Sequence, residues 1–106
     1  MKPLEQILES IRDSKSMYET LKLSQVPDQS EILRKLSIAY SDLSDHRIEA
    51  RETWMFHYNE AKGTNAYREK FADHKVPELY LIRRTMESTK VLIGSITMTL
   101  SAAKNV

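Results

Sequence analysis

Residues 77–103, PELYLIRRTMESTKVLIGSITMTLSAA, carry the most regular hydrophobic pattern of the chain. The residues of this pattern recur at alternating steps of three and four: Leu79, Ile82, Met86, Thr89, Ile93, Ile96, Leu100 and Ala103. This is the spacing of the a and d positions of a heptad, and it predicts one long helix with a buried seam. Because β-branched residues are dense in 91–100, a strand is the alternative for that part.

The second half of this helix is apolar on nearly every side. Such a helix lies at the centre of a fold or in an oligomer interface. A chain of 106 residues is too small to cover all of its sides, so we expect a homo-oligomer. The predicted interface consists of Leu92, Ile93, Ile96, Met98 and Leu100. Gly94 costs ~1 kcal/mol inside a helix and is better tolerated if another backbone packs closely against it.

An amphipathic helix is predicted over 3–22, followed by a break at 23–28. Pro27 is expected to keep the residue before it out of the α conformation. Asp28 and Glu31 then have the spacing of a capping box, which opens the next helix.

That next helix is predicted over 29–62, because no breaker interrupts it. Its expected inner stripe consists of Leu36, Tyr40, Leu43, Ala50, Trp54, His57 and Ala61. Gly63 is expected to end the helix as a C-terminal glycine. A short helix over 66–72 follows, capped by Thr64 or Asn65.

The composition also indicates an all-α fold. Two glycines and three prolines leave few turn positions, whereas an all-β fold needs a turn every ~8–12 residues. We expect a single helical domain over 1–106, in which a short N-terminal amphipathic helix packs on a long antiparallel helical hairpin that oligomerises through its C-terminal helix. With no cysteine and no apolar run of ~18 residues, we expect a cytoplasmic protein without disulfides or a membrane span.

No catalytic motif is present, so we expect neither an enzyme nor a cofactor. Glu49 and Glu52 place two carboxylates on one helical face, but no second pair follows at metal-site spacing, which favours a solvated charged face. His57 and Glu60 stand three residues apart, and the third and fourth ligands of a metal site are missing. We therefore predict no metal site.

Segment 54–71, WMFHYNEAKGTNAYREKF, contains five of the eight aromatic residues. Residues 1–61 hold 8 basic and 11 acidic side chains, net −3, whereas 62–106 hold 8 basic and 4 acidic, net +4. Aromatic faces among cations are what single-stranded nucleic acid binding uses. The predicted binding residues are Trp54, Tyr58, Tyr67 and Phe71 for stacking, with Lys62, Arg68, Lys70, Arg83 and Arg84 for phosphates.

A structural alternative exists for the same residues. The aromatic side chains can close the end of a helical hairpin. The two adjacent arginines, Arg83 and Arg84, can pair with carboxylates of the acidic first half.

The segment 61–68, AKGTNAYR, followed by a long helix over 78–100 resembles small all-α proteins from the early, replication and recombination regions of bacteriophages. The recombination mediator UvsY of T-even phages is similar in plan, although its binding motif has no residue-by-residue counterpart here. The resemblance implies a non-catalytic accessory protein that binds single-stranded DNA as an oligomer in the host cytoplasm. The same plan also suits a phage inhibitor of a host factor or defence system, acting by protein binding or as a nucleotide sponge.

Overall fold

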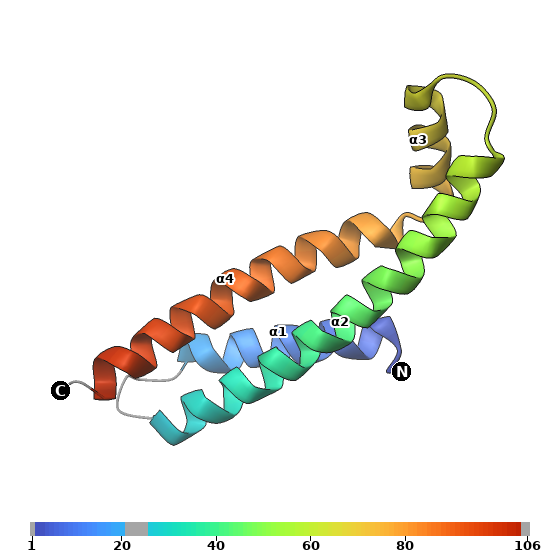
Figure 1. The fold of residues 1–106 in the computed structure, drawn as a ribbon. Coiled ribbons are helices and arrows are strands. Elements are labelled where there is room, and N and C mark those ends of the chain that lie inside the picture. Colours follow the sequence, from blue (N-terminus) through green and yellow to red (C-terminus); the bar gives the residue numbers. More distant parts are fainter. Residues whose placement is uncertain (1, 21–25, 105–106) are drawn as a thin grey trace.

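The computed structural model describes residues 2–20 and 26–104, and within these ranges it is all-α, without a strand (Figure 1). It contains helices α1 (Leu4–Thr20), α2 (Val26–Glu60), α3 (Asn65–Lys75) and α4 (Glu78–Lys104). The predicted all-α fold is confirmed, and the strand considered for 91–100 is wrong. Residues 23–25 of the predicted break, and 21–22 at the end of the predicted first helix, lie outside the described residues. None of the described helices combines the length and the apolar character that crossing a bilayer requires.

The helices form an elongated bundle with two different ends (Figure 1). Helices α2 and α4 lie side by side and run in opposite directions. Helix α1 packs mainly on the N-terminal half of α2. Helix α3 packs on the C-terminal end of α2. The molecule measures 60 × 23 × 18 Å, and its radius of gyration is 17.6 Å, against ~13 Å for a compact chain of this length. Three helices therefore share a core at one end, and two helices meet at the other.

The predicted seam of α4 is confirmed as the core side of that helix. Its buried members are Leu79, Ile82, Met86, Thr89, Ile96 and Leu100, and Ile93 is partly buried. The side chain of Ala103 lies outside the described residues. Helix α2 buries Ile32, Leu36, Ala39, Leu43 and Ala50 in the same core as the seam of α4. Helix α1 contributes Ile7 and Ile11 to that core. The heptad spacing thus selects the residues that join the three helices.

The N-terminal end of α2 differs from the prediction. The helix begins at Val26, so Pro27 lies in its first turn and Asp28 does not cap it. The first turn tolerates proline because its N–H groups have no partner within the helix. Glu31 pairs with Arg34, one turn further along, with a shortest N–O distance of 2.6 Å. The predicted capping box is therefore wrong, and Asp28 instead places a negative charge in the first turn, which the helix dipole favours.

The connection between α2 and α3 is longer than predicted. Helix α2 ends at Glu60, two residues early, while Gly63 has a φ of +129°, a conformation that favours glycine. Thr64 is the N-cap of α3, and its hydroxyl accepts a hydrogen bond from the Tyr67 N–H at 3.2 Å. Helix α3 continues to Lys75, three residues beyond its predicted end.

Candidate nucleic-acid interface

The last turns of α2, the following connection and α3 form a separate projection, residues 54–75, which we call the α3 lobe (Figure 1). The Trp54 indole N–H donates to the Asp73 carboxylate at 2.8 Å. The Tyr58 hydroxyl donates to the Asn65 side-chain oxygen at 3.2 Å. The Trp54 and Tyr58 rings are stacked, with centroids 5.2 Å apart and an interplanar angle of 13°. Trp54 and Tyr58, two of the four predicted stacking residues, therefore hold α3 on α2.

Arg68 belongs to the same helix–helix contact. Its Nε–H donates to the Tyr58 carbonyl at 3.0 Å, and its guanidinium carbon lies 4.1 Å from the centroid of the Tyr58 ring. The hydrogen bond satisfies a carbonyl in the last turn of α2, which has no partner within the helix. Phe71 is partly buried beside His57, with ring centroids 6.3 Å apart. For Trp54, Tyr58, Arg68 and Phe71 the structure shows the packing of a hairpin end.

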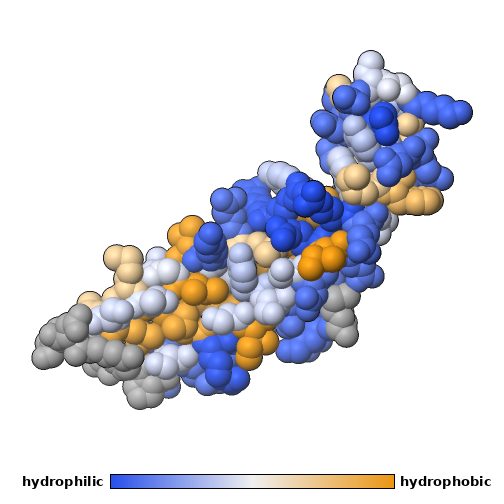
Figure 2. Space-filling model, in the orientation of Figure 1, coloured by the Kyte–Doolittle hydropathy of each residue, from blue (hydrophilic) through white to orange (hydrophobic). Residues whose placement is uncertain are grey.

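The other predicted binding residues are exposed: Lys62, Tyr67, Lys70, Arg83 and Arg84. Tyr67 is 56% exposed. Within residues 2–20 and 26–104, the ion pairs are Lys2–Asp42, Glu31–Arg34 and the His57–Glu60 contact. The predicted alternative for Arg83 and Arg84, pairing with carboxylates of the acidic half, is therefore not found. Figure 2 shows hydrophilic side chains gathered over the first half of α4 and over most of the α3 lobe.

A groove between α2 and α4 contains residues that the sequence prediction missed. Its lining consists of Tyr40, Arg47, Arg83, Met86, Glu87 and Lys90, and its volume is about 320 Å³. Arg83 also lines a neighbouring depression of about 310 Å³, together with Tyr80 and Asp73. These residues are far apart in the sequence, and only the antiparallel contact of the two helices brings them together. No local motif signals such a site.

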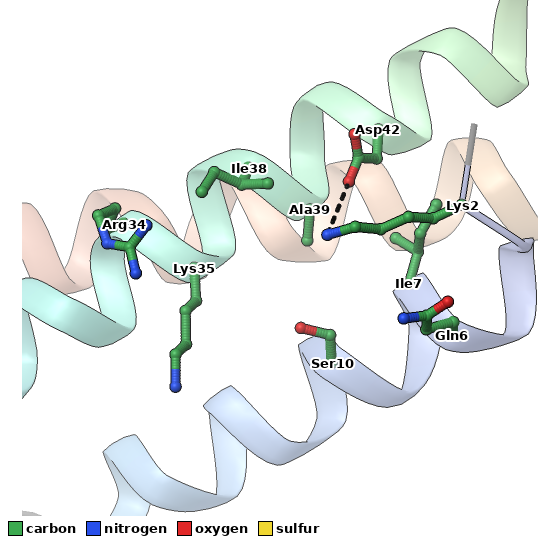
Figure 3. Close-up of a pocket in the computed structure, with 9 residues that line it drawn as sticks. All are labelled: Lys2, Gln6, Ile7, Ser10, Arg34, Lys35, Ile38, Ala39 and Asp42. Carbon is green, nitrogen blue, oxygen red and sulfur yellow. Dashed lines mark ion pairs between the residues drawn. The ribbon is translucent and has the colours of Figure 1, made fainter.

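A second groove, between α1 and α2, also carries basic side chains (Figure 3). Lys2, Arg34 and Lys35 line it beside one carboxylate, two polar and three apolar side chains, and its volume is about 270 Å³. Lys2 faces Asp42 at 3.8 Å. Two hydrogen bonds from Arg34 hold the pKa of the Glu31 carboxyl below its usual value. Because two of its three cations already have carboxylate partners, this groove offers less free positive charge than the groove between α2 and α4.

The outward side of α2 carries an apolar stripe. Ile48, Met55 and Phe56 are exposed, and Phe56 is 58% exposed. With Arg47, Arg51, Glu52 and Asn59 they line an open depression of about 480 Å³. Every lining residue belongs to α2, so within the described chain no second helix covers this stripe.

The predicted oligomer interface is divided between the core and the surface. Ile96 and Leu100 are buried within the chain, and Leu92 and Ile93 are partly buried. Met98 is 75% exposed. Hydrophobic side chains gather on the surface over the second half of α4 (Figure 2). A Cβ added at Gly94 would meet no described atom within 4 Å, so no backbone of the described chain packs against that glycine.

The acidic residues and histidines singled out in the sequence do not converge. Glu49 and Glu52 line separate depressions. The His57 ring nitrogen and the Glu60 carboxylate lie 3.9 Å apart, without a further acidic or imidazole group. Across the described ranges, no three such side chains are placed to hold a metal ion together.

Comparison of the chain with models of protein families, with curated proteins and with solved structures finds no match.

Proposed function

We propose that the protein is a non-catalytic accessory protein of phage-type DNA recombination or replication, which binds single-stranded nucleic acid as an oligomer. The observation that carries this proposal is the exposed set of Lys62, Lys70, Arg83 and Arg84, none of which forms an ion pair within residues 2–20 and 26–104. Uncompensated cations on a surface attract a phosphate backbone. Exposed Tyr67 adds an aromatic face to which a base can stack.

The roles of the predicted residues differ under this proposal. Tyr67 stacks on a base, and the four exposed cations contact phosphates. Trp54, Tyr58, Arg68 and Phe71 keep α3 in place, so they act on binding through the shape of the α3 lobe.

Self-association is proposed to use the outward side of α4. Val91 and Met98 are exposed there, seven residues apart, with Gly94 between them. A helix of a second copy can approach closely at a glycine, because no side chain separates the two backbones. The buried residues Ile96 and Leu100 support α4 from within the chain.

The test is fluorescence anisotropy with a labelled oligo-dT strand at low and high salt, beside light scattering after size exclusion. We expect a defined oligomer whose affinity falls as the salt concentration rises. The double variant Lys62→Gln/Lys70→Gln is expected to weaken binding, whereas Lys15→Gln/Arg12→Gln on α1 has the same charge change and should not. Equal affinities of the two variants, or no binding at low salt, would contradict the proposal.

A protein-binding inhibitor of a host factor is the second candidate, and the exposed apolar stripe on α2 favours it. An apolar patch on a surface is typical of protein interaction sites. Under this alternative, wild-type protein fails to bind the oligonucleotide but retains one stoichiometric host protein. Phe56→Glu abolishes that retention, and Glu9→Gln on α1 serves as the control.

A further inference from the structure

The groove between α2 and α4 concentrates positive charge from two helices. Helix α2 contributes Tyr40 and Arg47, and α4 contributes Arg83 and Lys90. Each pair is separated by seven residues, which is two turns or ~10.5 Å. The two helices run in opposite directions, and all four residues line the same groove.

The charges in this groove are not balanced. Three cations face one carboxylate, that of Glu87, and no ion pair of the described residues includes any of the four. Unpaired cations that line one groove raise the positive potential there and attract anions. The groove therefore favours ligands with several negative charges.

The groove continues toward the α3 lobe. Arg83 lines both this groove and the depression beside Tyr80, at the junction of α3 and α4. Tyr80 is 71% exposed, which leaves its ring available to a base. Cations spaced along a path with an aromatic ring beside them match the chemistry of a single strand, whose phosphates and bases alternate.

We propose that a single strand of nucleic acid lies along the groove between α2 and α4, with its phosphates at Arg47, Arg83 and Lys90 and a base stacked on Tyr80. The proposal rests on the proposed function and extends it to Arg47, Lys90 and Tyr80. The strand then follows the long axis of the bundle and passes from the groove onto the α3 lobe.

Neutralising two groove cations tests the path. The variant Arg47→Gln/Lys90→Gln is compared with Arg12→Gln/Lys15→Gln on α1, which has the same charge change on exposed residues outside the groove. Each lost phosphate contact reduces the slope of log K against log salt by ~0.7, which is about fivefold in affinity at about 0.1 M salt. We expect about 25-fold weaker oligo-dT binding for the groove variant and a change within about twofold for the control.

Photocrosslinking of wild-type protein gives a second readout that does not depend on any variant. An oligonucleotide containing iodouracil is expected to form adducts with Tyr80. Equal affinities of the groove variant and the control would contradict the proposed course of the strand along the groove. Binding without adducts at Tyr80 would contradict it as well. If Lys62→Gln/Lys70→Gln still weakens binding in that case, the proposed function stands and only the path fails. If wild-type protein does not bind oligo-dT at all, both fail.

Discussion

Thr89 is a polar residue in the middle of the apolar seam of α4. It is 1% exposed, and its hydroxyl oxygen has no hydrogen-bond partner among the described residues. The hydroxyl of a helical threonine can donate to a carbonyl one turn earlier, as Thr97 does to Ile93 at 2.8 Å. Burying a hydroxyl without a partner costs ~1–3 kcal/mol. Thr89 therefore lowers the stability of the bundle at its centre.

Thr89→Val removes this hydroxyl and keeps the shape of the side chain. We expect the free energy of unfolding to rise by about 1 kcal/mol, measured by urea denaturation. Thr97→Val is the control on the surface of the same helix and should change stability by less than about 0.5 kcal/mol. A loss of stability in Thr89→Val would mean that the hydroxyl is hydrogen-bonded in solution.

Gly63, unlike Thr89, is a residue whose replacement is expected to lower stability, because the backbone conformation at this position favours glycine. Its φ of +129° is unfavourable for any residue with a side chain, and a Cβ would lie 3.3 Å from the Tyr67 ring. Gly63→Ala is expected to lower the free energy of unfolding by at least about 1 kcal/mol, measured by thermal denaturation. A neutral result would mean that the connection between α2 and α3 adopts another conformation in solution.

At the scale of a single element, Gly94 lies inside α4 with open space around it. Gly94→Ala is therefore expected to raise the stability of the helix by about 0.5–1 kcal/mol. The substitution is the same as at Gly63, but the expected effect has the opposite sign because the local backbone is helical. The measurement is urea denaturation at low protein concentration.

The same variant also tests the proposed contact between copies of α4. If the two backbones approach closely at Gly94, an added methyl group separates them, so light scattering should show weaker self-association of Gly94→Ala. Unchanged association of a stabilised variant would place the contact between copies elsewhere.

For the whole molecule, burial is uneven along the long axis. The end where α1, α2 and α4 meet buries Ile7, Leu36, Leu43 and Ile96 to 2% exposure or less. In the α3 lobe, the one fully buried side chain of residues 54–75 is Ala72. Polar contacts such as Trp54–Asp73 hold the lobe instead. The two ends should therefore differ in local stability, since opening follows the amount of buried apolar surface.

Native-state hydrogen exchange tests this difference. Amides of 65–75 are expected to exchange faster than those of 32–43, because the lobe opens without unfolding of the three-helix end. Trp54→Phe removes the hydrogen bond to Asp73 and should speed exchange in 65–75 while leaving 32–43 unchanged. Uniform protection of both segments would indicate that the chain unfolds as one unit.

The sequence determined the helices and their buried sides. The heptad of α4 and the inner stripe of α2 could be predicted because helical periodicity places these residues on one side of a helix, whatever lies opposite. The aromatic cluster around Gly63 was also visible, because its members are close in the sequence. The start of α2 could not be predicted from the sequence, because Pro27 is compatible both with a break and with the first turn of a helix.

Only the tertiary structure decided which polar and aromatic side chains remain free. Trp54 and Arg68 look like binding residues in the sequence, but α3 folds back and uses both to hold α2. Arg47 and Lys90 carry no local signal, because the antiparallel pairing of α2 and α4 brings them to one groove. Hydrophobic periodicity shows which side of a single helix is buried. Whether a polar side chain is free to bind a ligand depends on the neighbouring helix, which can be far away in the sequence.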